Sequence, residues 1–300
     1  MISIVICTHN RPDDLQLCLE ALHPQASVDR CEIVVVDSGS HEAASIRNVV
    51  CRFAGVRLVR VHEAGLSIAR NAGLESTSSE WIAFIDDDAI ASSDWVENAC
   101  RLIAIAPEKC AIIGGDVAPQ YPGGSSPQIG WRWKQLLSLV SQPDESFGAA
   151  SVAVCGANVI YRREPLTAVG GFPSSLGRIG ARLLSGEEKL VQEVLIAQGW
   201  NVARSNRLSV RHRIDPQRLN RSWAINRAHW DGISDERVLR LIGQPTSTLE
   251  ILIILMRTLG LSILYGSNDT GKEYFIRFWY NLGRAKEWAY DRVRFNRHRS

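Results

Sequence analysis

The stretch that decides the fold is WIAFIDDDAI, residues 81–90, where a mostly bulky apolar segment runs straight into three consecutive carboxylates. A short apolar run of this kind predicts a buried strand. Acids packed this closely repel one another and lower stability unless a cation or a basic partner lies beside them. One interpretation is a polar turn whose acids cap the helix expected near residues 92–94. The crowding favours the other, a site for a divalent cation.

Similar apolar segments, rich in β-branched residues, alternate with segments of helical spacing on either side of this stretch. We expect strands at residues 3–7, 32–36, 56–61, 81–85 and 111–114, and helices at 13–22, 43–53, 67–76 and 93–106. This alternation predicts an α/β fold, a mainly parallel sheet flanked by helices on both faces. Ligands bind such sheets at the carboxyl ends of the strands. Polar clusters follow three of these strands, at residues 8–11, 37–40 and 86–88.

Charge and cysteine content indicate which partners and which redox compartment suit the protein. The net charge of +2 hides an asymmetry, because residues 201–300 hold 18 Lys and Arg against 9 Asp and Glu. A basic region of this kind suits nucleic acid, anionic lipid or an anionic substrate, and charge alone does not choose among them. The seven cysteines form no C-x-x-C pair and predict reduced thiols in a cytosolic protein. We expect the N-terminus to begin as a strand, not as a signal peptide.

Single residues after the strands leave alternatives open. Asp37 suits hydrogen bonding to a nucleobase or ribose, and it equally suits an Asx-turn at the end of a strand. Arg70 lies near a predicted helix start, where it suits a phosphate or a base, and the alternative is a surface arginine. A G-x-G-x-x-G nicotinamide motif and a G-x-x-x-x-G-K-[ST] phosphate loop are absent from the sequence.

Taken together and in order, these motifs resemble the family 2 glycosyltransferases of the GT-A fold. The resemblance covers residues 1–215 and rests on ICTHNR (6–11), EIVVVDSGS (32–40), ARNAG (69–73) and FIDDD (84–88). It implies a Rossmann-like nucleotide-binding part, and residues that surround the nucleotide: Thr8, His9, Arg11, Asp37, Arg70, Asp86 and Asp87. Asp86 and Asp88 occupy the ends of the family's Asp-x-Asp motif, so the resemblance implies a Mn²⁺ or Mg²⁺ ion with Asp88 as a direct ligand.

The resemblance extends to the cleft and the catalytic base. Gly156, Ala157 and Asn158 match the segment that lines the donor and acceptor cleft. Glu187 and Glu188 stand where the family usually has Glu-Asp, so Glu188 is the expected base and Glu187 its rival. The alternative is an ordinary acidic first turn of a helix. His212 matches a late histidine that binds metal or diphosphate, or else it is structural.

The resemblance implies an inverting, metal-dependent glycosyltransferase of polysaccharide or glycolipid synthesis. UDP is the family's commonest nucleotide, with dTDP and GDP also in use, and the acceptor is a glycan, a lipid-linked molecule or another small hydroxyl compound. No nucleic-acid partner is implied. The rival interpretation is a catalytically silent nucleotide-sugar-binding or scaffold protein of the same fold. A base placed opposite the metal argues against it, since a binding module has no need of one.

Beyond residue 215 the family motifs stop. We expect a basic, amphipathic helical region at residues 216–300, with helices at 216–229, 234–242, 247–265 and 271–295. The apolar segment 249–265 is interrupted by Glu250 and Arg257 and falls short of the roughly 20 clean apolar residues of a spanning helix. Two interpretations stay open: a peripheral contact with the inner face of the cell membrane, or a helical subdomain that packs internally or forms a homo-oligomer. We expect a cytoplasmic location.

Overall fold

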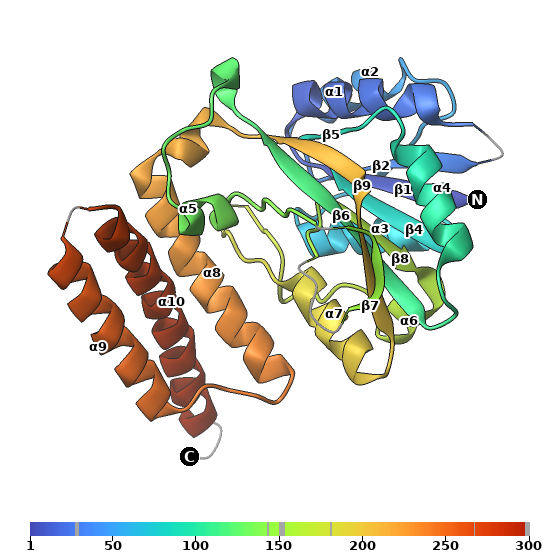
Figure 1. Cartoon of the computed structure of the whole chain (residues 1–300). Helices are drawn as coiled ribbons and strands as arrows, with labels where there is room; N and C mark the ends of the chain where they lie inside the picture. Colours follow the sequence, from blue (N-terminus) through green and yellow to red (C-terminus); the bar gives the residue numbers. More distant parts are fainter. Residues whose placement is uncertain (28–29, 143, 150–153, 181, 267, 298–300) are drawn as a thin grey trace. The chain divides into compact units, whose positions relative to one another are not determined.

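A computed structural model describes residues 1–27, 30–142, 144–149, 154–180, 182–266 and 268–297 (Figure 1). The chain divides into two compact units. The sheet unit comprises residues 1–120, 138–180 and 187–214, and the helical unit comprises residues 121–137, 181–186 and 215–300. The helical unit thus takes in two short segments that precede residue 215, besides the C-terminal region.

The described strands of the sheet unit form one nine-stranded sheet. They are β1 (Ile2–Thr8), β2 (Cys31–Ser38), β3 (Arg57–Val61), β4 (Trp81–Asp86), β5 (Ala89–Ala91), β6 (Cys110–Gln120), β7 (Ser146–Ala149), β8 (Asn158–Arg162) and β9 (Asn201–Arg213). Their order is β3-β2-β1-β4-β8-β6-β9-β5, with β7 beside β9. The half β3-β2-β1-β4 is parallel. The predicted parallel character holds for this half, and the rest is mixed because β8, β5 and β7 pair antiparallel with their neighbours.

Helices cover both faces of the sheet, as the alternation in the sequence predicts. They are α1 (Pro12–Leu22), α2 (Ala43–Val50), α3 (Leu66–Glu75), α4 (Trp95–Ile105), α6 (Arg163–Ala168) and α7 (Glu187–Ala197), with a 3-10 turn η1 (His23–Gln25) after α1. Alternate side chains of each strand enter opposite cores, since the side-chain period of a strand is two residues. Ile4 of β1 packs with α1, α2 and α4, whereas Val5 packs with α3, α6 and α7.

The register of the parallel strands brings their carboxyl ends to one edge. Thr8 lies opposite Asp37 of β2, and Cys7 lies opposite Asp86 of β4. The sheet therefore ends in a row of polar side chains directly above two apolar cores, which is the arrangement expected of a ligand-binding edge.

The helical unit is built on three long helices. It contains α5 (Trp131–Leu136), α8 (Arg221–Leu241), α9 (Thr248–Tyr265) and α10 (Asp269–Arg297), with 3-10 turns η2 (Pro122–Gly124) and η3 (Pro216–Leu219). In this unit α10 lies between α8 and α9 (Figure 1). Residues 298–300, the end of the predicted basic stretch, lie outside the described residues. α5 ends at Leu136, two residues before Ser138, which adopts a positive φ of 60°.

The region predicted as two helices, 216–229 and 234–242, contains the single helix α8, preceded by a 3-10 turn. The predicted gap at residues 230–233 contains Gly232, and glycine weakens a helix interior. The structure gives this glycine a packing role instead: a Cβ there would lie 1.8 Å from the carbonyl oxygen of Tyr280 on α10. The same holds at Gly283 of α10, where a Cβ would lie 1.9 Å from the carbonyl oxygen of His229. α8 and α10 approach closely at these two glycines. The helix continues through Gly232 because this close packing outweighs the low helix propensity of glycine.

Candidate active site

The carboxylate triplet lies at the end of β4, and two of its acids are held by Thr8, the last residue of β1, and by Arg11, which directly precedes α1. Thr8 Oγ1 donates to Asp87 Oδ2 at 2.8 Å. The guanidinium of Arg11 donates to Asp87 Oδ1 at 3.2 Å and to Asp88 Oδ2 at 2.9 Å. The side chains of Asp87 and Asp88 are each 6% exposed, against 33% for Asp86. Arg11 is therefore a basic partner that offsets the repulsion between two of the three acids.

Burial dominates the acid–base behaviour of the middle acid. It raises the pKa of the Asp87 carboxyl to about 7, while Arg11 lowers that pKa and the charge of Asp88 raises it further. The same two acids raise the pKa of Arg11 against the opposing effect of its burial. The cluster thus depends on the arginine for its charge balance.

His212 joins the triplet through the sheet. β9 pairs with β5 so that His212 lies opposite Ala89, which sets its Nε2 3.2 Å from Asp88 Oδ1. Two ligands at about 2.1 Å from one octahedral ion, at right angles, are about 3.0 Å apart. The two atoms are close enough for a direct hydrogen bond, and the same separation also fits two adjacent positions around a divalent cation. Across the described residues, no three His, Cys, Asp or Glu side chains gather to hold a metal, so phosphate oxygens and waters would complete the shell.

Arg70 of α3 connects the end of β4 with the start of α7. Its guanidinium lies 2.7 Å from Glu187, 3.6 Å from Asp86 and 3.8 Å from Glu188. The Arg70 side chain is only 3% exposed, so these ion pairs form with little water around them. Burial lowers the pKa of Arg70, but Glu187, Glu188 and Asp86 together raise it overall. The arginine stays charged and ties three acids from distant parts of the chain to one point.

The two acids of α7 occupy different environments. The Glu187 side chain is 2% exposed, and burial together with the charge of Glu188 raises its pKa to about 8, against the lowering effect of Arg70. The Glu188 side chain is 19% exposed, and its Oε1 accepts a hydrogen bond from the backbone N–H of Gly156 at 3.2 Å. Of the two, Glu188 is therefore the acid that an incoming molecule can reach.

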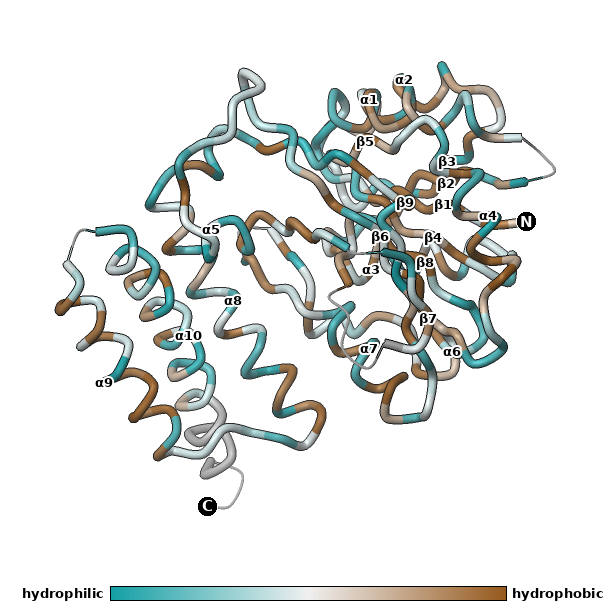
Figure 2. Tube along the Cα trace, in the orientation of Figure 1, coloured by the Kyte–Doolittle hydropathy of each residue, from teal (hydrophilic) through white to brown (hydrophobic). Residues whose placement is uncertain are grey.

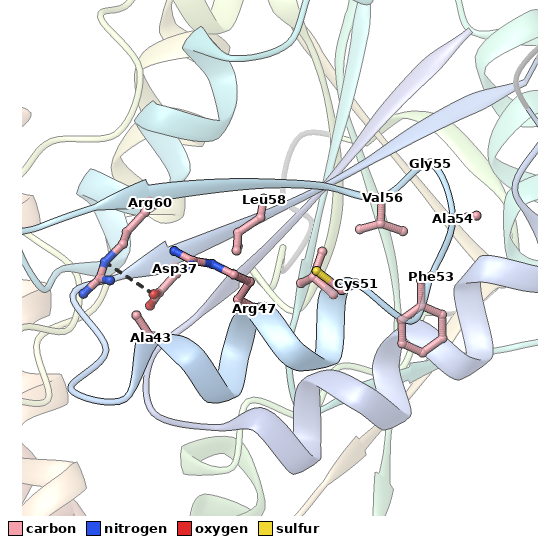
Figure 3. Close-up of a pocket in the computed structure, with 11 residues that line it drawn as sticks. Asp37, Ala43, Arg47, Cys51, Phe53, Ala54, Gly55, Val56, Leu58 and Arg60 are labelled. Carbon is pink, nitrogen blue, oxygen red and sulfur yellow. Dashed lines mark ion pairs between the residues drawn. The ribbon is translucent and has the colours of Figure 1, made fainter.

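Asp37 reaches the same edge from β2 and borders a pocket of about 530 Å³ (Figure 3). Its Oδ1 accepts from the backbone N–H of Ser40 at 3.1 Å, and its Oδ2 lies 3.8 Å from Arg60 Nε. The register of β2 and β3 places Asp37 opposite Arg60. Beyond this pair the pocket runs along α2, where Phe53 and Val56 give it an apolar end. The Asp37 contact with Ser40 reaches three residues along the chain, one more than in an Asx-turn, and its second oxygen faces the Arg60 guanidinium.

Sequence comparison identifies the family. The profile described as "Glycosyl transferase family 2" matches residues 3–170, more than half of the chain. The chain belongs to this family. It is a glycosyltransferase with the GT-A fold.

Three known proteins show how far the similarity of this family 2 glycosyltransferase extends. The "glucosyl-dolichyl phosphate glucuronosyltransferase" of Haloferax volcanii is 27% identical over 80% of the chain and 78% of its own length. The "succinoglycan biosynthesis protein ExoM" of Rhizobium meliloti is 27% identical over 79% of the chain and 75% of its own length. A mannosyltransferase from Pyrobaculum calidifontis, solved in complex with GDP-Man and Mn²⁺, has a TM-score of 0.58 at 17% identity, over 95% of the chain and 86% of its own length.

The predicted cleft segment of this glycosyltransferase divides into two kinds of position. A Cβ at Gly156 would lie 2.0 Å from Arg70 Nη2, so glycine allows the arginine to pass, and its backbone holds Glu188. Ala157 and Asn158 are fully buried. The Asn158 side chain accepts from Trp95 Nε1 and donates to two backbone carbonyls. Asn158 thus holds the core together and does not face a cleft, because all its polar atoms already bind protein groups.

One neighbour of Asp37 has no signal of its own in the sequence. Arg60 lies opposite Asp37 only because β2 and β3 pair, so no motif along the chain indicates it. His9, which the family resemblance places beside the nucleotide, has its Nδ1 2.6 Å from the Ser38 carbonyl oxygen, between the ends of β1 and β2. All seven cysteines are free, and four of them are buried, whereas Cys51 is exposed.

Proposed function

We propose that this glycosyltransferase is an inverting, metal-dependent enzyme with Glu188 as general base. It moves a sugar from a nucleotide-sugar donor, with UDP as the first candidate, to a hydroxyl of a lipid-linked acceptor. The observation that carries the proposal is the shared arginine: Asp86 and Glu188 lie 3.6 and 3.8 Å from the Arg70 guanidinium, so the acid beside the nucleotide and the base belong to one cluster.

The reaction is a single displacement. The acceptor oxygen forms a bond to the anomeric carbon while the bond from that carbon to the diphosphate oxygen breaks, and the configuration inverts. The acceptor's proton passes to the Glu188 carboxylate. Of the two α7 acids, Glu188 suits this role because it is the more exposed and is held by the Gly156 backbone.

The donor is held by residues of the sheet edge. Thr8, His9, Arg11, Asp37 and Asp87 surround the nucleotide, with Asp37 toward the base. Asp88 and His212 would hold a Mn²⁺ or Mg²⁺ ion, with Asp86 at the other end of the Asp-x-Asp motif. When bound, such an ion would supply positive charge beside the diphosphate.

The acceptor class is supported by the relatives. The Haloferax volcanii protein is named for glucosyl-dolichyl phosphate, a lipid-linked sugar, and the Rhizobium meliloti protein is named for succinoglycan biosynthesis. Each matches about four fifths of the chain. A polyprenyl phosphate-linked sugar is accordingly the first acceptor to test. GDP- and dTDP-sugars belong in the donor screen, since the mannosyltransferase of similar fold was solved with GDP-Man.

The test compares the two acids of α7. Donor and acceptor are chosen by a thermal-shift screen of sugar nucleotides with Mn²⁺, followed by transfer assays on lipid-linked sugars. Glu188→Gln should reduce transfer at least 1000-fold while nucleotide affinity stays within about twofold, whereas Glu187→Gln should retain measurable transfer. Product NMR should show an inverted anomeric centre. Transfer by Glu188→Gln near the parent rate, or a retained configuration, would refute the assigned base or the mechanism.

A further inference from the structure

The outward side of α9 carries an unusual row of exposed apolar side chains. Six of them, between 45% and 72% exposed, define what we call the outer face of α9: Leu249, Leu252, Ile253, Met256, Leu259 and Ile263. Their spacings of three, four and seven residues put them on one side of a helix. Figure 2 shows the hydrophobic colouring along α9, at the margin of the helical unit. At 100° per residue the face spans roughly 120°, and exposed Leu264 widens it to roughly 140°.

The opposite side of α9 already has its partner. Ile251 and Thr258 are each 4% exposed, and α9 packs on α10. Glu250 and Arg257 are exposed and border the outer face. Only 11% of the 18-residue apolar window is buried. Contrary to the sequence-based expectation, the helix is long and apolar enough to cross a membrane by length and composition alone, with Glu250 and Arg257 inside it. The outer face is therefore not needed to hold α9 in its unit.

The charge of the helical unit distinguishes between a membrane and a second copy. The unit holds 17 Lys and Arg against 9 Asp and Glu, a net charge of +8. A second copy would bring a like charge of +8 against the first. An anionic bilayer offers the opposite charge to the basic residues and an apolar layer to the outer face. The exposed apolar side of α9 is also wider than the contact surface of a coiled coil, in which two residues of each heptad are apolar.

We propose that the outer face of α9 inserts into the interfacial layer of an anionic bilayer, with α9 parallel to the membrane surface. The helix lies on the bilayer and does not span it, because Ile251 and Thr258 pack on α10 and Arg257 borders the apolar face. The biological reason rests on the proposed function, since a lipid-linked acceptor is presented at that surface.

Flotation of the purified full chain tests the proposal. Vesicles of phosphatidylcholine with a minority of phosphatidylglycerol should carry at least tenfold more protein to the top of a gradient than vesicles of phosphatidylcholine alone. Added potassium chloride should reduce this binding, because salt screens surface charges. The double variant Leu252→Gln/Met256→Gln should lose at least tenfold. Leu241→Gln, which changes an exposed leucine of α8, is the matched control and should float like the parent.

Each outcome either supports or contradicts one of the two proposals. A parent chain that ignores anionic vesicles, or a double variant that floats like the parent although circular dichroism shows both folded, overturns the proposal. A parent that stays in solution as a dimer, split by the double variant, assigns the face to a second copy and also overturns it. Flotation uses no donor or acceptor, so a chain that floats but transfers no sugar contradicts only the proposed function. A chain that transfers sugar in detergent but does not float contradicts only the membrane contact.

Discussion

Glu187→Gln should make the stability of the protein less dependent on pH. Glu187 is fully buried against Arg70 and beside Glu188, and its pKa rises from the ordinary 4.5 to about 8. Gln has nearly the same shape and keeps a carbonyl oxygen that accepts from Arg70, but it carries no titrating proton. The variant therefore isolates the cost of charging this position from the cost of losing its contacts.

The direction follows from linkage. A carboxyl whose pKa is raised in the folded state binds its proton more tightly there, so its stabilising effect is complete below pH 4.5 and is lost as the pH rises through 8. The interval from 4.5 to about 8, at about 1.4 kcal/mol per pH unit, amounts to about 5 kcal/mol as an upper value. Relative to the parent, the Glu187→Gln variant should become progressively more stable across this interval and level off above it.

Urea unfolding of parent and variant at a series of pH values from 4 to 9 measures this difference directly. Glu193→Gln, on the exposed side of the same helix, is the matched control and should follow the parent at every pH. Parallel curves for parent and Glu187→Gln between pH 5 and 8 would refute the reasoning, since they would mean that Glu187 titrates alike in the folded and unfolded chains.

Two further comparisons use matched pairs of variants. Asp88→Asn should raise the Mn²⁺ concentration needed for half-maximal transfer more than Asp87→Asn does, because Asp88 lies beside His212 whereas Asp87 binds Thr8 and Arg11; equal shifts would contradict this division. Gly232→Ala should destabilise the chain by about 1–3 kcal/mol or more through the clash with α10. Gly260→Ala, where a Cβ meets nothing, should stabilise it by up to about 1 kcal/mol. Thermal unfolding measures both, and a stable Gly232→Ala protein would contradict the close helix contact.

The sequence predicted the part of the fold that local patterns determine. The first four parallel strands follow from their apolar runs, and the polar residues after them follow from the rule that such strands end at one edge. That Asp37 and Asp86 flank β1 is a consequence of parallel pairing, and the register confirms it. These residues could be selected because each stands next to the end of its own strand.

Long-range pairing could not be predicted in the same way. His212 reaches Asp88 only because β9 runs for thirteen residues and pairs with the three-residue β5, neither of which has a distinctive pattern of its own. Asn158 looks like a cleft residue in the sequence, yet Trp95 and two backbone carbonyls satisfy it in the core. The meaning of Gly232 likewise depends on Tyr280, on another helix. Each case depends on a partner far along the chain.

Arg70 shows why such partners matter for chemistry. Burial favours the protonated form of Glu187 and raises its pKa, so this acid neutralises less of the Arg70 guanidinium than an exposed carboxylate at the same distance would. More of the positive charge of Arg70 then remains for Asp86 and Glu188, the two more exposed acids of the cluster. A fully ionised Glu187 would instead neutralise more of the guanidinium charge on its buried side. Burial of Glu187 therefore directs the arginine toward the acids that ligands can reach, and this division of roles is invisible in two consecutive glutamates.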